Sequence, residues 1–154
     1  MIDKKQVEEI VREFIVSSEV ELINLVVTPD NHIQVDIDSY QGVDIDTCVA
    51  LSNFIEDRLS RDVEDYELQV GGVSITDPFK TIMQYKKHLG HEVIVLTGEG
   101  VRLTGELVEV NDNDFSVDVV EMVKQEGAKR RHRQVVTKTF NYTEVKSVCY
   151  NLKV

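Results

Sequence analysis

Apolar residues near the start of the chain recur at the spacing of an amphipathic helix. Asp3 can cap this helix, because a side-chain oxygen at the N-cap accepts an otherwise unpaired backbone N–H. The apolar residues after it lie three or four positions apart, which places them on one helical face: Val7, Ile10, Val11 and Phe14. We therefore expect a first helix that buries this face.

The spacing changes to every second residue over residues 20–38, VELINLVVTPDNHIQVDID. Two strand-like runs flank Pro29, Asp30 and Asn31, which favour a turn, so we expect a β-hairpin. Successive side chains of a strand point to opposite faces. One face of the second strand then carries Ile33, Val35 and Ile37, and the other carries His32, Gln34, Asp36 and Asp38.

A second helix and a third strand complete this half of the chain. Asp44 can cap the helix, and Asp46 suits its positive N-terminal end. The apolar residues of the helix are Cys48, Val49, Leu51, Ile55 and Leu59, and a strand over residues 66–70 (YELQV) follows. The order is α-β-β-α-β, and the simplest packing puts both helices on the apolar face of the sheet. The open face then displays Gln34, Asp36, Asp38, Glu67 and Gln69.

Regular spacing stops at residues 71–78, GGVSITDP, which we interpret as a joint. Pro78 suits the first position of a short helix capped by Thr76 or Asp77, and Gly90 suits its end. The apolar residues expected to anchor this helix are Phe79, Ile82, Met83 and Leu89.

Alternation returns after the joint and predicts five short strands. Turns are expected at residues 98–100, 111–114 and 142–144, and Gly105 fits a sharp bend inside the second of these strands. Five short strands with a helical turn before the last are typical of an SH3-like or Sm-like barrel.

The predicted fold class is therefore α+β, an α-β-β-α-β domain followed by a five-stranded SH3-like or Sm-like β-barrel. We place the first domain at residues 1–74, the joint with its short helix at residues 75–90 and the barrel at residues 91–154.

The balance of charge also changes near the joint. Residues 1–78 hold 5 Lys and Arg against 18 Asp and Glu, whereas residues 79–154 hold 12 against 10, within a net formal charge of −11. Such asymmetry between halves predicts two surfaces with different partners. The acidic open face should repel phosphate and suit a basic protein, the alternative being an ordinary solvated sheet face.

Positive charge is concentrated in EGAKRRHRQ, residues 126–134. We expect this stretch to be a hairpin tip rather than part of a strand ladder, able to neutralise RNA phosphates. The residues predicted to bind RNA are Lys129, Arg130, Arg131 and Arg133, and His132 should add little at neutral pH. The alternative is a solvated loop whose charge only balances nearby acids.

The carboxylates of residues 35–46, VDIDSYQGVDID, do not match a metal-binding loop. Counted from Asp36, a calcium loop needs Gly at the sixth position and Glu at the twelfth, where Gln41 and Thr47 stand. We predict no metal and no other cofactor.

Other catalytic patterns are also missing. The stretch GEGVRLTG lacks the third Gly of a dinucleotide loop, because Leu103 stands there. Cys48 and Cys149 have no supporting motif and are expected to be buried thiols. We find no Ser-His or His-carboxylate pattern and predict that the protein is not an enzyme. The N-terminus has no signal-peptide pattern and no apolar run could span a membrane, so we expect a cytoplasmic protein. We also expect a monomer.

Four stretches occur in a characteristic order and spacing: VDIDSYQGVDIDTCVALSNFIEDRL, KHLGHEVIVLT, RLTGELVEVNDNDFSVDV and FNYTEVKSVCYNL. In this order and spacing the chain resembles the RimP family of ribosome maturation factors over nearly its whole length. The joint departs from the family pattern, because Asp77 stands at its arginine position and Gln69 at its acidic start. Any role of that arginine does not transfer to this chain.

The resemblance implies a KH-like first domain without the G-x-x-G loop, a Sm-like second domain and no catalysis. It also implies binding to the immature small ribosomal subunit, 30S, through 16S rRNA and a basic ribosomal protein. We assign RNA contact to the basic run and protein contact to Asp36, Asp38 and Glu67. The competing hypothesis is an RNA-binding module that acts outside ribosome assembly.

Overall fold

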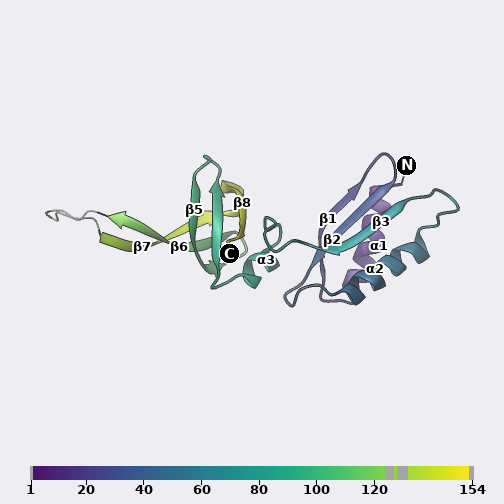
Figure 1. Cartoon of the computed structure of the whole chain (residues 1–154), viewed down its shortest axis with the longest axis horizontal. Helices are drawn as coiled ribbons and strands as arrows, with labels where there is room; N and C mark the ends of the chain where they lie inside the picture. Colours follow the sequence, from purple (N-terminus) through teal and green to yellow (C-terminus); the bar gives the residue numbers. More distant parts are fainter. Residues whose placement is uncertain (1, 124–126, 128–131, 153–154) are drawn as a thin grey trace. The chain divides into compact units, whose positions relative to one another are not determined.

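The computed structural model describes residues 2–123, 127 and 132–152, and the chain folds into two compact units, residues 1–74 and 75–154 (Figure 1). The first unit contains α1 (Lys4–Val16), β1 (Glu21–Val27), β2 (His32–Asp38), α2 (Ile45–Arg58) and β3 (Glu67–Gly72). The second contains α3 (Ile82–Lys87), β4 (Glu92–Thr97), β5 (Arg102–Val110), β6 (Asp114–Val123), β7 (His132–Asn141), the 3-10 turn η1 (Tyr142–Glu144) and β8 (Val145–Tyr150).

Both predicted helix caps of the first unit are confirmed. The Asp3 carboxylate accepts the Lys5 N–H at 3.0 Å, and the Asp44 carboxylate accepts the Thr47 N–H at 2.8 Å. Each bond satisfies a backbone donor that the helix itself leaves unpaired, which is why the helices begin where they do.

The three strands of the first unit form a sheet in the order β1-β2-β3, with β2 antiparallel to β1 and parallel to β3. Both helices pack on the same face of this sheet, because their apolar sides share one core with the alternate residues of β2. That core includes Val7 and Val11 of α1, Leu51 and Ile55 of α2, and Ile33, Val35 and Ile37 of β2. The predicted layer arrangement is confirmed.

One of the apolar residues of α2 does not lie in the core. Val49 is 51% exposed, whereas Leu51, Ile55 and Leu59 are buried and Cys48 packs partly against them. The buried residues lie three, four or eight positions apart, and Val49 falls off this stripe. Helix α2 therefore exposes part of its apolar surface to solvent.

The helix of the joint begins later than predicted. Thr81, rather than Thr76 or Asp77, is its N-cap, in a capping box with Gln84. Just before it, the Phe79 N–H donates to the Val148 carbonyl of β8 at 2.7 Å, so this residue bonds to the sheet and not within a helical turn. As a result Gln84, Tyr85 and His88 are buried beside Phe79, whereas Leu89 is 42% exposed.

The second unit is an antiparallel sheet in the order β7-β6-β5-β4-β8, and its predicted turns are confirmed. One core spans the sheet and includes Val93, Val95, Leu107, Phe115, Val117 and Val148. Gly105 lies where β6 approaches most closely: a Cβ built there would stand 2.3 Å from the Asp118 carbonyl oxygen. The strand tolerates only glycine at this position without movement of β6.

Strands β6 and β7 continue beyond the rest of the sheet as a two-stranded arm (Figure 1). We define the arm as residues 119–123 and 132–136, which pair with each other beyond Asp118, the last residue of β6 that pairs with β5. The prediction that Arg133 and His132 lie in a hairpin tip is wrong, because β7 begins at His132. Since β7 is an edge strand, charged side chains are tolerated there.

Candidate functional site

The open face of the first sheet gathers the polar residues predicted to bind protein. Residues 32 and 67, 34 and 69, and 36 and 71 are direct neighbours across β2 and β3. We call Gln34, Asp36, Glu67 and Gln69 the acidic sheet face. They lie opposite the helices, because the alternate residues of both strands face the core.

Both carboxylates of the acidic sheet face have a short polar contact. His32 Nε2 lies 2.8 Å from Glu67 Oε2, and the Gln34 amide donates to Asp36 Oδ1 at 2.8 Å. Within the described part of the chain, neither Asp36 nor Glu67 forms an ion pair with Lys or Arg. Both carboxylates therefore keep capacity for a positively charged partner.

Asp38 does not belong to this surface, contrary to the prediction. Its residue is 5% exposed, and its carboxylate accepts the Ser39 N–H at 2.9 Å. Asp38 ends β2, so its side chain serves the turn that follows, as short acidic side chains commonly do. Strand alternation alone does not report this local bond.

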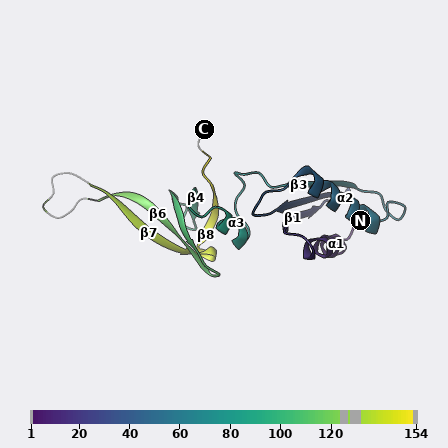
Figure 2. The same ribbon diagram turned by 90° about the horizontal axis from the view of Figure 1, so that it is seen from below.

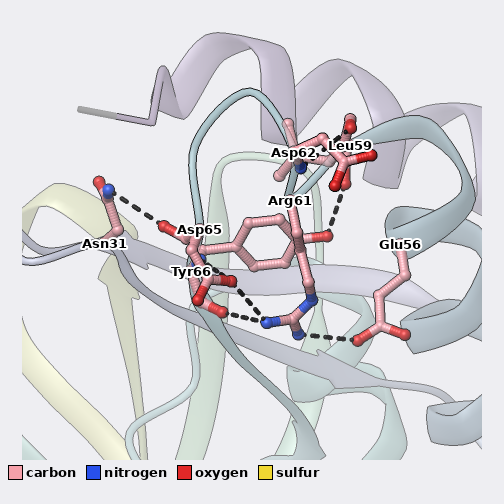
Figure 3. A network of polar contacts seen from close by, with 8 residues as sticks. Asn31, Glu56, Leu59, Arg61, Asp62, Asp65 and Tyr66 are labelled. Atoms are coloured by element: carbon pink, nitrogen blue, oxygen red, sulfur yellow. Dashed lines mark hydrogen bonds and ion pairs between the residues drawn. The ribbon is translucent and has the colours of Figure 1, made fainter.

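A polar network fixes the loop between α2 and β3, and no sequence pattern indicated it (Figure 3). The Arg61 guanidinium donates to Asp65 Oδ1 at 3.1 Å, to the Tyr66 carbonyl at 2.6 Å and to Glu56 Oε1 at 3.1 Å. It also lies over the Tyr66 ring, 4.4 Å from its centroid. These bonds to Glu56 and Asp65 raise the pKa of Arg61 above its ordinary value.

The far side of the loop is held in the same network. The Tyr66 hydroxyl donates to the Leu59 carbonyl at 2.7 Å, and burial raises its pKa. The Asn31 side-chain amide donates to the Asp65 backbone carbonyl at 3.2 Å. The Asn31 backbone carbonyl accepts the Glu67 N–H at 2.9 Å. The network therefore sets where β3 begins.

A groove of about 710 Å³ lies between α2 and β3. Its lining includes Ile45, Cys48 and Val49 of α2 and Leu68, Val70 and Gly72 of β3. Burial, followed by the nearby Asp44 carboxylate, raises the pKa of the Cys48 thiol. Because the thiolate is the nucleophilic form, Cys48 is not an activated nucleophile.

The structure describes only part of the predicted RNA-binding run. Lys129, Arg130 and Arg131 lie outside the described residues. Arg133 is exposed on β7 directly opposite Met122. The same side of the arm carries Val120 and Val135, which pair with each other and are 59% and 62% exposed. Arg133 thus lies on the β6–β7 ladder with exposed apolar side chains beside it.

A metal site would need several His, Cys, Asp or Glu side chains close together. Across residues 2–123, 127 and 132–152, no group of three or more His, Cys, Asp or Glu could hold a metal ion. None of the helices in the same residues is long and apolar enough to cross a membrane. Cys48 and Cys149 are free and partly buried.

The fold and its surfaces define an α+β protein with an acidic α/β unit and a separate antiparallel β unit. A family model described as "RimP N-terminal domain" matches residues 10–72. Ribosome maturation factor RimP from each of two strains of Porphyromonas gingivalis is 40% identical over 95% of this chain and 96% of its own length. The same-named protein of Christiangramia forsetii is 30% identical over 74% of both chains. The chain belongs to the RimP family of ribosome maturation factors.

Proposed function

We propose that this protein is a non-enzymatic, cytoplasmic ribosome assembly factor that binds the immature 30S subunit and promotes its maturation. The observation that carries this proposal is the similarity to proteins named ribosome maturation factor RimP, which extends over 95% of the chain. Similarity of this extent includes both units rather than one shared module.

We assign the two contacts of this function to different units. The acidic sheet face would bind a basic ribosomal protein, because Asp36 and Glu67 have no cationic partner of the Lys or Arg type in the described residues. Opposite charges steer such an encounter and favour the correct partner. Asp38 is left out of this surface because it is buried.

The basic run, residues 129–133, would bind 16S rRNA through its Lys and Arg side chains. Arginine suits phosphate because its planar guanidinium can donate two parallel hydrogen bonds. Arg133 supports this role, since it is exposed and its position is fixed by the β6–β7 ladder. The exposed apolar side chains beside it could contact unpaired bases.

We also propose that the second sheet closes into the Sm-like barrel. Strands β7 and β8 are the two edges of the sheet, and η1 joins them directly. Side chains from both ends of the strand order contribute to one core, with Phe140 of β7 packing against it and Val148 of β8 within it. A curled sheet brings both edges to the same core.

Cells that lack this protein test the function. We expect free small subunits to accumulate and their 16S rRNA to keep unprocessed ends, and we expect re-expression of the chain to restore both. Normal subunit ratios and normal 16S ends in the deletion strain would contradict the proposal. Altered levels of other RNAs with normal subunits would instead favour an RNA-binding role outside ribosome assembly.

A further inference from the structure

The groove between α2 and β3 has the features of a peptide-binding site. The helix and the strand lie side by side in both ribbon views (Figures 1 and 2). Strand β3 pairs with β2 on one side, and within the described residues no strand pairs with its other side. An unpaired edge presents backbone donors and acceptors to any extended chain.

The register identifies which backbone groups face outward. The Glu67 N–H donates to Asn31 and the Val73 N–H donates to Ile37, so the odd-numbered residues of β3 bond to β2. Hydrogen bonding alternates along a strand, and the N–H and C=O groups of Leu68, Val70 and Gly72 therefore face the groove. These three residues offer one side of a ladder.

The opposite wall of the groove carries exposed apolar side chains of α2. Ile45 is 81% exposed and Val49 is 51% exposed, and both line the groove with the partly buried Cys48. Exposed apolar side chains beside a free strand edge favour an extended peptide, whose backbone bonds to the edge while alternate side chains contact the helix. Val49, which lies off the buried stripe of α2, is part of this exposed apolar surface.

The charge around the groove favours a positively charged peptide. Asp44 lines the groove, and its lining contains no Lys or Arg among the residues that the structure describes. Residues 1–74 hold 5 Lys and Arg against 17 Asp and Glu. A peptide with Lys or Arg between its apolar residues would be attracted, whereas an acidic peptide would be repelled.

We propose that the groove between α2 and β3 binds an extended basic peptide by adding it as a fourth strand beside β3. The inference deepens the proposed function, since a basic ribosomal protein is the partner proposed there and an extended segment of it would supply such a peptide. The Arg61 network supports binding because it fixes the start of β3 before the peptide arrives, which reduces the entropy lost on association.

Hydrogen exchange on the full chain tests the mode of binding. The probe is an end-blocked ten-residue peptide of alternating Val and Lys. We expect the amides of Leu68, Val70 and Gly72 to exchange at least about tenfold more slowly with the peptide, because each gains a strand bond. The control peptides carry Glu in place of Lys, or Pro in place of Val, and should give no protection. Unchanged exchange at all three amides overturns the proposal, whether or not the peptide binds elsewhere.

Matched variants test the location. The change Val49→Lys places a positive charge on the groove wall, and Val16→Lys makes the same change at an 87% exposed position that does not line the groove. We expect Val49→Lys to weaken peptide binding at least about tenfold and Val16→Lys to change it less than about twofold. Equal effects of the two variants overturn the proposal, as does slower exchange at β3 with a single-stranded RNA but not with the peptide.

These experiments distinguish a failure of this inference from a failure of the proposed function. A chain that sediments with small subunits but does not bind the peptide at β3 rejects only this inference. A chain that binds the peptide at β3 but never associates with small subunits rejects only the ribosomal role.

Discussion

Gly105 lies where strands β5 and β6 approach each other most closely, which leaves no room for a side chain. A side chain there would meet the Asp118 carbonyl oxygen at 2.3 Å and the Val117 Cγ1 at 2.7 Å, both on β6. Because backbone atoms cannot yield as a flexible side-chain end can, strand β6 would have to move. This is the strand that leads into the arm.

We expect Gly105→Ala to destabilise the protein by about 1–3 kcal/mol, the usual cost of adding volume where there is no room. The matched control is Gly71→Ala, because a Cβ at Gly71 would meet nothing within 4 Å and its φ is not positive. Urea unfolding followed by circular dichroism measures both variants. Equal stability of the two variants would show that the close approach to β6 does not constrain this position.

Elements with locally determined ends were predictable from the sequence. Asp3 and Asp44 cap helices through backbone groups two or three residues away, and the turn at residues 98–100 uses Gly100 at positive φ. The start of α3 was misplaced although Thr81 and Gln84 carry the T-x-x-Q signature of a capping box. What the sequence could not show is the bond from Phe79 to Val148, which joins residues that are distant along the chain.

The candidate site was predictable to a smaller extent. Alternation correctly placed Asp36 and Glu67 on the open face of the sheet, but it could not show that Asp38 turns back to Ser39. The groove and the Arg61 network were missed because they depend on how α2 approaches β3. The available signals were Gly71 and Gly72 within a strand, and an apolar Val49 off the helical stripe.

The acidic sheet face gives a prediction for β2 and β3. We expect the double variant Asp36→Asn and Glu67→Gln to weaken binding to a basic ribosomal protein, with the difference shrinking as salt is added, because mobile ions screen charge. The control is Glu9→Gln with Asp57→Asn, which removes the same charge from exposed helical positions. Calorimetric titration of the purified proteins over a salt series measures the affinities. An equal loss in both variants would indicate general charge attraction without a role for the face.

The basic run gives a prediction for RNA binding by the second unit. Replacing Lys129, Arg130, Arg131 and Arg133 with Gln should reduce affinity for 16S rRNA. It should also flatten the plot of log affinity against log salt by about 0.7–0.9 for each phosphate that the protein no longer neutralises. The substitutions should alter folding stability by no more than about 0.5 kcal/mol each.

The matched control for the basic run replaces four exposed positive residues elsewhere: Lys4, Lys5, Arg102 and Lys146. We expect these to leave the salt slope of RNA binding close to that of the original chain. Filter-binding or fluorescence titrations with a 16S rRNA fragment measure the slopes. An unchanged slope in the basic-run variant would mean that the positive charge of the run does not contact RNA.

At the scale of the whole molecule, separate cores predict separate folding. The core of the first unit draws on residues of α1, α2 and the first sheet, and the core of the second draws on residues from Phe79 onward. We expect fragments 1–74 and 75–154 each to fold alone with modest stability, because small domains bury a smaller share of their surface. Dispersed amide NMR spectra from both fragments would agree with this. Collapsed spectra from both, beside a folded intact chain, would contradict it.

If the proposed function holds, the division into two units would let one acidic chain contact both protein and RNA. The first unit holds 17 of the 28 Asp and Glu residues, and the second contains the basic run and an arm that extends past the rest of its own sheet. Each partner would then meet the charge opposite to its own. A tether between the units is sufficient for both contacts to occur on one particle.

Sucrose-gradient sedimentation of cell extract tests the central claim most directly. The chain would carry a C-terminal tag, be expressed at its native level, and be detected across the gradient at low and moderate salt. We expect it to co-migrate with free small subunits and to be missing from translating ribosomes, with stronger association in cells that accumulate immature subunits. A chain that stays at the top of the gradient in mild salt, or that follows mature ribosomes, would contradict its role as an assembly factor.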